Sequence, residues 1–331
     1  MNQAALKKPA GIMTGYRKAN SFCHCLAEVL PYVSEQPLSY TEIMGYTGLA
    51  FHINVEVSSI NKWGPAMYDW GGIHIAGIKN LGLQARMSGC SGPDPHLQQI
   101  RQDVIEIAKK SIDNGVPAIL WEARGPEFGL AYGYDDCEEA FVAADWHGEG
   151  RLAYDQIGAA AGAANAETDV ISVTAIEHMK VIDRREALTN ALKTALFYGF
   201  EDCKVWHDFV SGLDAYDVWT ALLSQDRVDP YGNAYSMHAF RDAREQAARF
   251  LRKSAHSDFL NVQARRKLEE AAGYYATTAD SFYLLQELFP FPEDRYTLDR
   301  KNAQLAIGLL KEAKEHEHRG LSSIADAVNE M

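Results

Sequence analysis

The stretch NSFCHCLAEVLPYV, from Asn20 to Val33, decides the fold together with PEFGLAYGYDDCEEAFVAAD, from Pro126 to Asp145. The first stretch predicts a helix over about Ser21–Tyr32. The second predicts strands at Phe128–Gly133 and Ala140–Ala144, because two apolar runs flank the polar turn YDDCEE. Strands joined by such a turn form a hairpin. A helix and a later hairpin therefore frame the first half of the chain.

The rest of the first half adds a helix and two strands. HLQQIRQDVIEIAKKSIDNG predicts an amphipathic helix that ends at Gly115, a residue suited to a helix C-terminus. Strands are expected at Val116–Glu122 and in DVISVTAIEHM, which ends at Met179. The small residues of GAAAGAANAET, from Gly158 to Thr168, predict a hinge between domains.

From Asp183 onward the sequence predicts only helices. Asp183 and Glu186 form a capping-box pattern at the start of the first of them. The fold class is therefore α+β, with an N-terminal domain over residues 1–182 and an all-α domain over residues 183–331. The expected helices are Arg184–Phe200, Asp214–Ser224, Ser236–Ser254, Asn261–Leu288 with a break near Gly273, and Leu298–His318 followed by a short terminal helix.

Charge and hydropathy exclude several classes of partner. The 331 residues include 32 Lys and Arg against 45 Asp and Glu, a formal charge of −13. Such a chain repels nucleic acid and anionic membranes, so neither is expected as a partner. No run of 18 apolar residues exists and the first residues lack an apolar signal core, so we expect a cytoplasmic protein. The sequence leaves the oligomeric state open.

No cofactor or metal is expected. The five cysteines are an odd and sparse set, which indicates free thiols. Cys203 and His207 stand four apart, but no second pair of ligands accompanies them. Glu315 and His318 have the spacing of di-iron ligands, yet a single copy within a charged EHEH run indicates a solvated helix end. Walker loops, dinucleotide fingerprints and GxSxG elbows are absent from the sequence.

The order of motifs resembles papain-like cysteine peptidases, in particular the bacteriocin-processing peptidases and the N-terminal domain of the butirosin-biosynthesis protein H acyltransferases. Val29, Leu30 and Tyr32 fit the VLxY part of the helix motif, LSYTEIMGYTGLAF fits the segment that follows it, and EFGLAYGYDD fits the histidine strand with its GYD turn. The resemblance covers about residues 15–180. It implies a papain-like domain with acyltransferase or hydrolase chemistry on a small molecule or peptide, free or carrier-bound.

Two of the three catalytic positions depart from that family. The resemblance places the nucleophile at Ser21, the histidine position at Glu127 and the orienting acid at Asp145. A serine needs a base to become a nucleophile, and an unperturbed carboxyl group with a pKa of about 4.3 is a weak base. The alternative to an enzyme is therefore an inactive member of the fold that binds a peptide or small molecule.

A different register would supply cysteine chemistry. Shortening the helix puts Cys23 or Cys25 at the nucleophile position, and His24 with Cys25 mimics the HC dipeptide of the butirosin-type motif. The alternative is that Ser21 is a helix cap and both cysteines are buried. Glu127 and Asp145 then belong to a solvated hairpin end.

An aromatic loop is the candidate for substrate binding. WGPAMYDWGG, from Trp63 to Gly72, places Trp63, Tyr68 and Trp70 among glycines. Aromatic loops of this kind line apolar clefts, but they also pack on protein cores. Both interpretations stay open.

Overall fold

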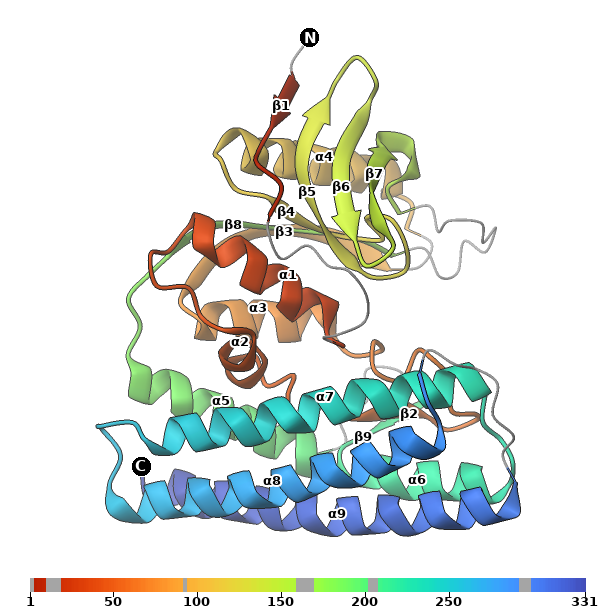
Figure 1. Ribbon diagram of the computed structural model, residues 1–331. Helices are drawn as coiled ribbons and strands as arrows, with labels where there is room; N and C mark the ends of the chain where they lie inside the picture. Colours follow the sequence, from red (N-terminus) through yellow and green to blue (C-terminus); the bar gives the residue numbers. More distant parts are fainter. Residues whose placement is uncertain (1–2, 10–18, 92–93, 159–169, 202–207, 292–298) are drawn as a thin grey trace. The chain divides into compact units, whose positions relative to one another are not determined.

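The computed structural model describes residues 3–9, 19–91, 94–158, 170–201, 208–291 and 299–331 (Figure 1). The chain forms two compact units. The first unit combines Met1–Ile43 with Gly82–Val181, and the second combines Met44–Leu81 with Ile182–Met331. The first boundary falls within α2 (Tyr40–Tyr46), so the chain enters the second unit, returns to the first and then enters the second again.

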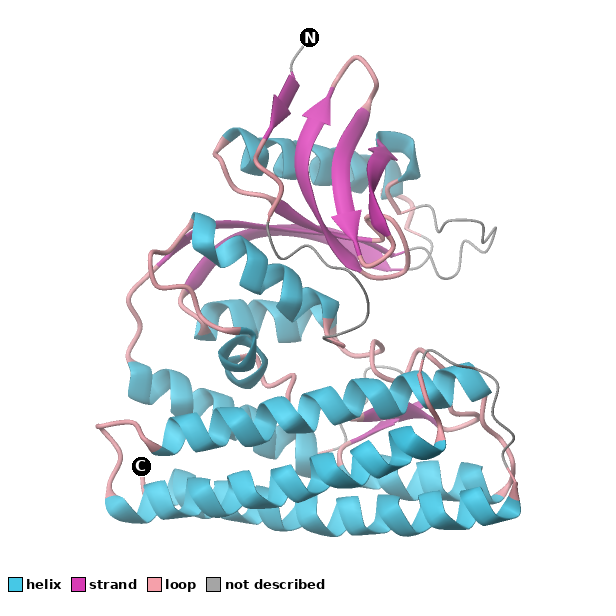
Figure 2. Cartoon of the chain, viewed as in Figure 1, coloured by secondary structure: helices cyan, strands magenta, loops and turns pink. Residues whose placement is uncertain are grey.

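An antiparallel sheet forms the centre of the first unit, where its strands are drawn in magenta in Figure 2. Its strand order is β3-β8-β4-β5-β6-β7, and β1 pairs with the end of β5 that β4 leaves unpaired. This mixture of helices and an antiparallel sheet agrees with the α+β class. The strands are β1 (Gln3–Ala5), β3 (Leu83–Ser91), β4 (Ala118–Trp121), β5 (Phe128–Asp135), β6 (Ala140–Asp145), β7 (Gly148–Ala153) and β8 (Val170–Met179).

Two helices cover this sheet. The apolar face of α4 (Leu97–Asp113) supplies Val104, Ala108 and Ile112 to a core that the sheet completes with buried side chains such as Phe141. The predicted amphipathic helix is thereby confirmed, and Gly115 just beyond it has φ +84°, a conformation that favours glycine. The other helix, α1 (Ser21–Val29), packs against β5 and continues as a 3₁₀ turn over Leu30–Tyr32. A second 3₁₀ turn, over Tyr154–Gln156, follows β7.

The second unit is mainly helical. Trp219, Phe240 and Phe282 lie in its core with their rings about 6 Å apart. The long helices α7, α8 and α9 lie side by side (Figure 1). The elements are α3 (Trp70–Asn80), α5 (Arg184–Phe200), α6 (Leu213–Ser224), α7 (Pro230–Ala255), α8 (Val262–Leu288), α9 (Arg300–Asn329) and the antiparallel pair of β2 (Asn54–Glu56) with β9 (Phe209–Ser211).

The division into units differs from two contiguous domains. The later boundary, between Val181 and Ile182, lies next to the expected one, but residues 44–81 belong with the C-terminal helices. The physical reason is apolar burial, because Ile53, Val55 and Ile60 lie in the same core as Trp219. The expected hinge, Gly158 to Thr168, lies outside the described residues except for Gly158.

The helices of the second unit confirm most of the pattern and correct two details. Asp183 accepts hydrogen bonds from the backbone N–H groups of Arg185 and Glu186, so α5 begins where the capping box predicted. The expected break near Gly273 is wrong, because α8 continues through it. The expected short terminal helix is also wrong, since α9 runs unbroken to Asn329. Across the described ranges, no helix is both long and apolar enough to cross a membrane.

Candidate active site

The N-terminus of α1 presents Ser21. The side chain of Asn20 caps the helix by accepting a hydrogen bond of 2.9 Å from the backbone N–H of Cys23, and Asn20 itself has an extended backbone. Ser21 is therefore the first helical residue, at the positive end of the helix dipole. Its side chain is buried, with 5% of the residue exposed.

Ser21 and Glu127 meet in the first unit. The Ser21 hydroxyl donates a hydrogen bond of 2.6 Å to Oε2 of Glu127, the residue just before β5. The same hydroxyl oxygen accepts a bond of 3.2 Å from the backbone N–H of Phe128. The ring of Phe128 packs edge-on against Phe22, with centroids 5.2 Å apart, and this contact joins the helix to the strand. The predicted register thus brings the nucleophile and histidine positions of the resemblance together, occupied by a serine and a glutamate.

The two cysteines of α1 are buried as well. Cys23 is fully buried and Cys25 is 4% exposed. Burial raises the pKa of the Cys25 thiol well above its ordinary value, and the negative charges of Asp145 and Glu28 raise it further. Cys25 therefore carries its proton at neutral pH. A pocket about the size of one water molecule lies beside it, lined by His24, Cys25, Glu28, Phe128, Gly129, Leu130, Ala144 and Asp145.

Asp145, at the end of β6, binds the loop that precedes Glu127. Its Oδ2 accepts hydrogen bonds of 2.8 Å from the backbone N–H groups of both Arg124 and Gly125. Its Oδ1 accepts one of 2.8 Å from the N–H of His147, and Nδ1 of His147 lies 3.4 Å from the same oxygen. The carboxylate is fully buried, and these N–H groups compensate its lost hydration.

The aromatic loop belongs to the second unit, whereas Ser21 belongs to the first. Tyr68 is buried, and its hydroxyl lies 3.1 Å from Nε2 of the buried His74. The indole N–H of Trp70 donates to the carbonyl of Ala66. Trp63 is 38% exposed. Tyr68 thus packs into the core of its own unit, and a role of this loop in substrate binding stays a prediction.

The candidate metal ligands are placed as follows. Cys203 and His207 lie outside the described residues. Glu315 pairs with Arg319 on the surface of α9, while the ring of His318 packs edge-on against Phe200. Among the residues that the structure describes, no group of three or more His, Cys, Asp or Glu side chains is arranged to hold a metal ion.

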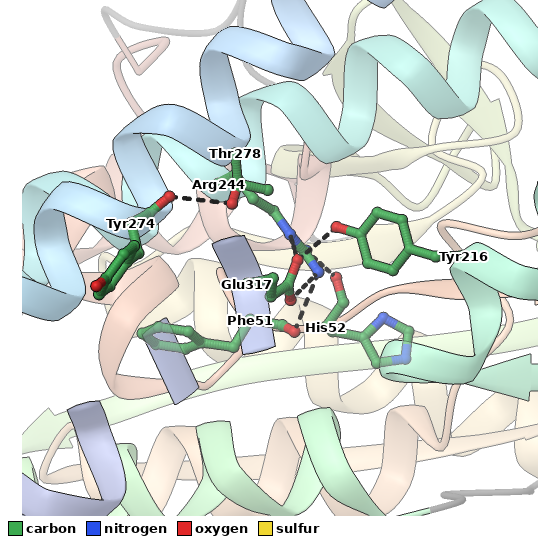
Figure 3. Close-up of polar contacts among 7 residues, drawn as sticks. All are labelled: Phe51, His52, Tyr216, Arg244, Tyr274, Thr278 and Glu317. Carbon is green, nitrogen blue, oxygen red and sulfur yellow. Dashed lines mark hydrogen bonds and ion pairs between the residues drawn. The ribbon is translucent and has the colours of Figure 1, made fainter. Parts of the chain in front are cut away.

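The second unit contains a buried ion pair that was not predicted from the sequence (Figure 3). Arg244 on α7 and Glu317 on α9 are 0% and 1% exposed, and two hydrogen bonds of 2.9 and 2.6 Å join them. The hydroxyl of Tyr216 also donates to Glu317, and the guanidinium group donates to the carbonyls of Phe51 and His52. The EHEH run is therefore solvated only in part, since Glu317 points into the core.

A sequence signal for this pair exists. Glu317 lies on the apolar stripe of its helix, seven residues after Leu310 and seven before Ile324, both of which are fully buried. Arg244 likewise stands between the buried Phe240 and Leu251 at helical spacing. Opposite charges on two apolar stripes indicate a buried pair, because an isolated charge in a core is strongly destabilising.

Gly125 and His147 are the residues near the candidate site that the sequence argument missed. A Cβ atom at position 125 would lie 2.3 Å from Nδ1 of His147, so the two residues are in tight contact. Their signal in the sequence is weak, because Gly125 and His147 each occupy a turn between strands. No protein-family model matches the chain, and no curated protein matches it.

Proposed function

We propose that the first unit catalyses acyl transfer or hydrolysis at an amide or thioester of a small molecule or peptide, with Ser21 as nucleophile and Glu127 as its base. The observation that carries the proposal is the hydrogen bond of 2.6 Å from the Ser21 hydroxyl to the Glu127 carboxylate. A serine is activated when a positioned base accepts its proton. The position of Ser21 at the N-terminus of α1 also favours negative charge on oxygen.

The reaction follows from these two groups. Ser21 Oγ attacks the carbonyl carbon while its proton passes to Glu127, and the proton then goes to the departing amine or thiol. The resulting acyl-serine is cleaved by water in hydrolysis or by an acceptor amine or thiol in transfer. Nucleophilic chemistry at Cys25 is disfavoured, because burial and neighbouring carboxylates raise the pKa of its thiol.

The proposed setting follows from charge and thiols. A chain with a formal charge of −13 suits a neutral or basic substrate, free or carrier-bound. Cys23, Cys25, Cys90 and Cys137 are free thiols, as is usual for a reducing compartment, so we place the protein in the cytoplasm.

A second candidate function is reversible binding by an inactive papain-like fold. It is favoured by the 5% exposure of Ser21 and by the water-sized pocket beside Cys25, which leave little room around the hydroxyl. Both candidates predict a ligand in the first unit, but only the first predicts a covalent adduct.

The test is acylation of Ser21 by a panel of acyl thioesters and by a fluorophosphonate, located by mass spectrometry of peptides. We expect an adduct on Ser21 that is absent from Ser21→Ala and forms at least about tenfold more slowly in Glu127→Gln, a barrier change of about 1.4 kcal/mol. The chain offers a matched control, because the exposed Ser39 donates a hydrogen bond of 2.7 Å to Glu42 at the start of α2. Ser39→Ala should leave the adduct unchanged.

Three results would count against the enzyme. Folded wild-type protein that forms no adduct with any probe would remove Ser21 as a nucleophile. A ligand bound with equal affinity by the wild type, Ser21→Ala and Glu127→Gln would favour the binding function. Equal labelling of Ser21 and Ser39 would show reactivity unrelated to the site.

A further inference from the structure

The loop before Glu127 is held by Asp145 and His147. The buried carboxylate of Asp145 accepts hydrogen bonds from the N–H groups of Arg124 and Gly125. The imidazole of His147 lies so close to Gly125 that a Cβ atom there would be 2.3 to 2.8 Å from three ring atoms. A side chain at position 125 would therefore require the His147 ring or the loop to move.

The position of Gly125 determines that of Glu127. The N–H of Glu127 donates a hydrogen bond of 2.7 Å to the carbonyl of Gly125, which closes a three-residue turn around Pro126. Proline fixes φ near −65°, so this turn has little freedom. The carbonyl of Glu127 in turn accepts a bond of 2.9 Å from the N–H of Glu122. The backbone of Glu127 is therefore held in place, and it lies only two residues after Gly125, which Asp145 binds.

We propose that Gly125, Asp145 and His147 form a backbone clamp that sets the Glu127 carboxylate against Ser21, and that Asp145 is a positioning residue acting through the loop. This role differs from an acid that orients a catalytic side chain directly. Asp145 engages backbone N–H groups at both oxygens, and it holds the main chain from which Glu127 projects. The inference rests on the proposed roles of Ser21 and Glu127.

Asp145→Asn is the sharpest perturbation of the clamp. Oδ2 accepts two N–H groups and Oδ1 accepts a third, so an amide in either orientation turns its own N–H₂ group toward a backbone N–H. The clamp must then open on one side. Gly125→Ala opens it differently, because the new methyl group displaces either the His147 ring or the loop.

The readout is the thiol of a Ser21→Cys variant, which needs no substrate and no turnover. A carboxylate next to this thiol raises its pKa and slows alkylation, so Ser21→Cys/Glu127→Gln should react faster with iodoacetamide. The gain should be about three- to fourfold for each unit of pKa removed, because the larger thiolate fraction is partly offset by the weaker nucleophilicity of a less basic thiolate. In Ser21→Cys, we expect Asp145→Asn and Gly125→Ala to accelerate alkylation by at least about threefold, toward the rate of the Glu127→Gln variant. Peptide mass spectrometry assigns the label to position 21.

A double-mutant cycle shows whether the clamp acts through Glu127. With Glu127→Gln already present, the clamp variants should change the rate by less than about twofold. Tyr134→Phe is the control. It removes the hydrogen bond of 2.8 Å that Tyr134, on β5, donates to Asp113, and it leaves the loop before Glu127 unchanged. This variant should leave the alkylation rate unchanged. Circular dichroism confirms that each variant is folded, and Gly125→Ala carries the test if Asp145→Asn does not fold.

The clamp is overturned if the variants leave the alkylation rate at position 21 unchanged, or if they change that rate equally in the presence and absence of Glu127→Gln. These failures are distinct from a failure of the proposed function. A missing acyl adduct with an intact thiol response would remove the enzyme and leave the clamp in place.

Discussion

Glu317→Gln should destabilise the second unit by about 3–5 kcal/mol, because it leaves the guanidinium of Arg244 charged and buried without its counter-ion. Both side chains are at most 1% exposed, so water cannot replace the lost charge. Burial lowers the pKa of Arg244, while Glu317 and the neighbouring tyrosines together raise it above the ordinary value. In the variant the arginine loses the contribution of Glu317 but stays charged, because a guanidinium group keeps its proton in proteins.

The same helix carries a matched control. Glu315 stands two residues before Glu317 and pairs with Arg319 at 2.9 Å, but the two side chains are 59% and 53% exposed. An exposed pair contributes about 0.2–1 kcal/mol at most, so Glu315→Gln should change stability little. The two substitutions are chemically identical, but Glu317 is buried and accepts hydrogen bonds from both Arg244 and Tyr216, whereas Glu315 is exposed and pairs with Arg319.

The assay is equilibrium urea unfolding followed by far-ultraviolet circular dichroism, in which the long helices of the second unit dominate. We expect a lower midpoint for Glu317→Gln with an unchanged slope, and a midpoint for Glu315→Gln close to that of the wild type. Equal midpoints for the two variants would refute the reasoning. In that case the burial of the Arg244 pair would not set its contribution.

Three further predictions concern buried polar groups. Tyr216→Phe should cost about 1 kcal/mol or more because Glu317 loses a donor, whereas Tyr275→Phe should be neutral or stabilising because its buried hydroxyl has no hydrogen-bond partner among the described residues; urea midpoints compare them. Burial lowers the pKa of the His74 imidazole to about 3, so the unfolded chain takes up this proton first as the pH falls. His74 should therefore contribute a loss of stability of about 1.4 kcal/mol per pH unit between pH 6.5 and about 3, and His74→Gln should remove this contribution from the slope. Cys25 should alkylate slowly at neutral pH because burial raises its pKa, and rapid labelling there would contradict this.

The sequence predicted the helices and strands that have a regular spacing of apolar residues and a capping or turn residue at their ends. Asp183 capped α5 as expected, and the hairpin of β5 and β6 follows the two apolar runs around YDDCEE. Short strands were missed, such as β1, because three residues carry no usable period. β3 was missed for another reason, since only Leu83 of its nine residues is buried and the sequence LQARMSGCS is mostly polar or small.

The sequence predicted the candidate site only through the resemblance, which assigned residues to catalytic positions. It placed Ser21 opposite Glu127, and the structure brings these two together. The resemblance did not show that Asp145 binds backbone N–H groups, because nearly every residue type has such a group and the sequence does not indicate which one is bound. The assignment of residues 44–81 to the second unit also depends on contacts across long stretches of chain, which no local window contains.

The discontinuous second unit constrains how the protein can be made and divided. Its segment 44–81 leaves the ribosome long before the helices that begin at Arg184, and in the interval the chain builds the whole sheet from β3 to β8. The early segment must therefore wait with Ile53 and Ile60 exposed until Trp219 and its neighbours have been synthesised. A C-terminal fragment starting at residue 182 lacks part of its own core, so truncation at the later boundary should yield no stable helical unit. Moving residues 44–81 to the front of that fragment through a short linker should restore it.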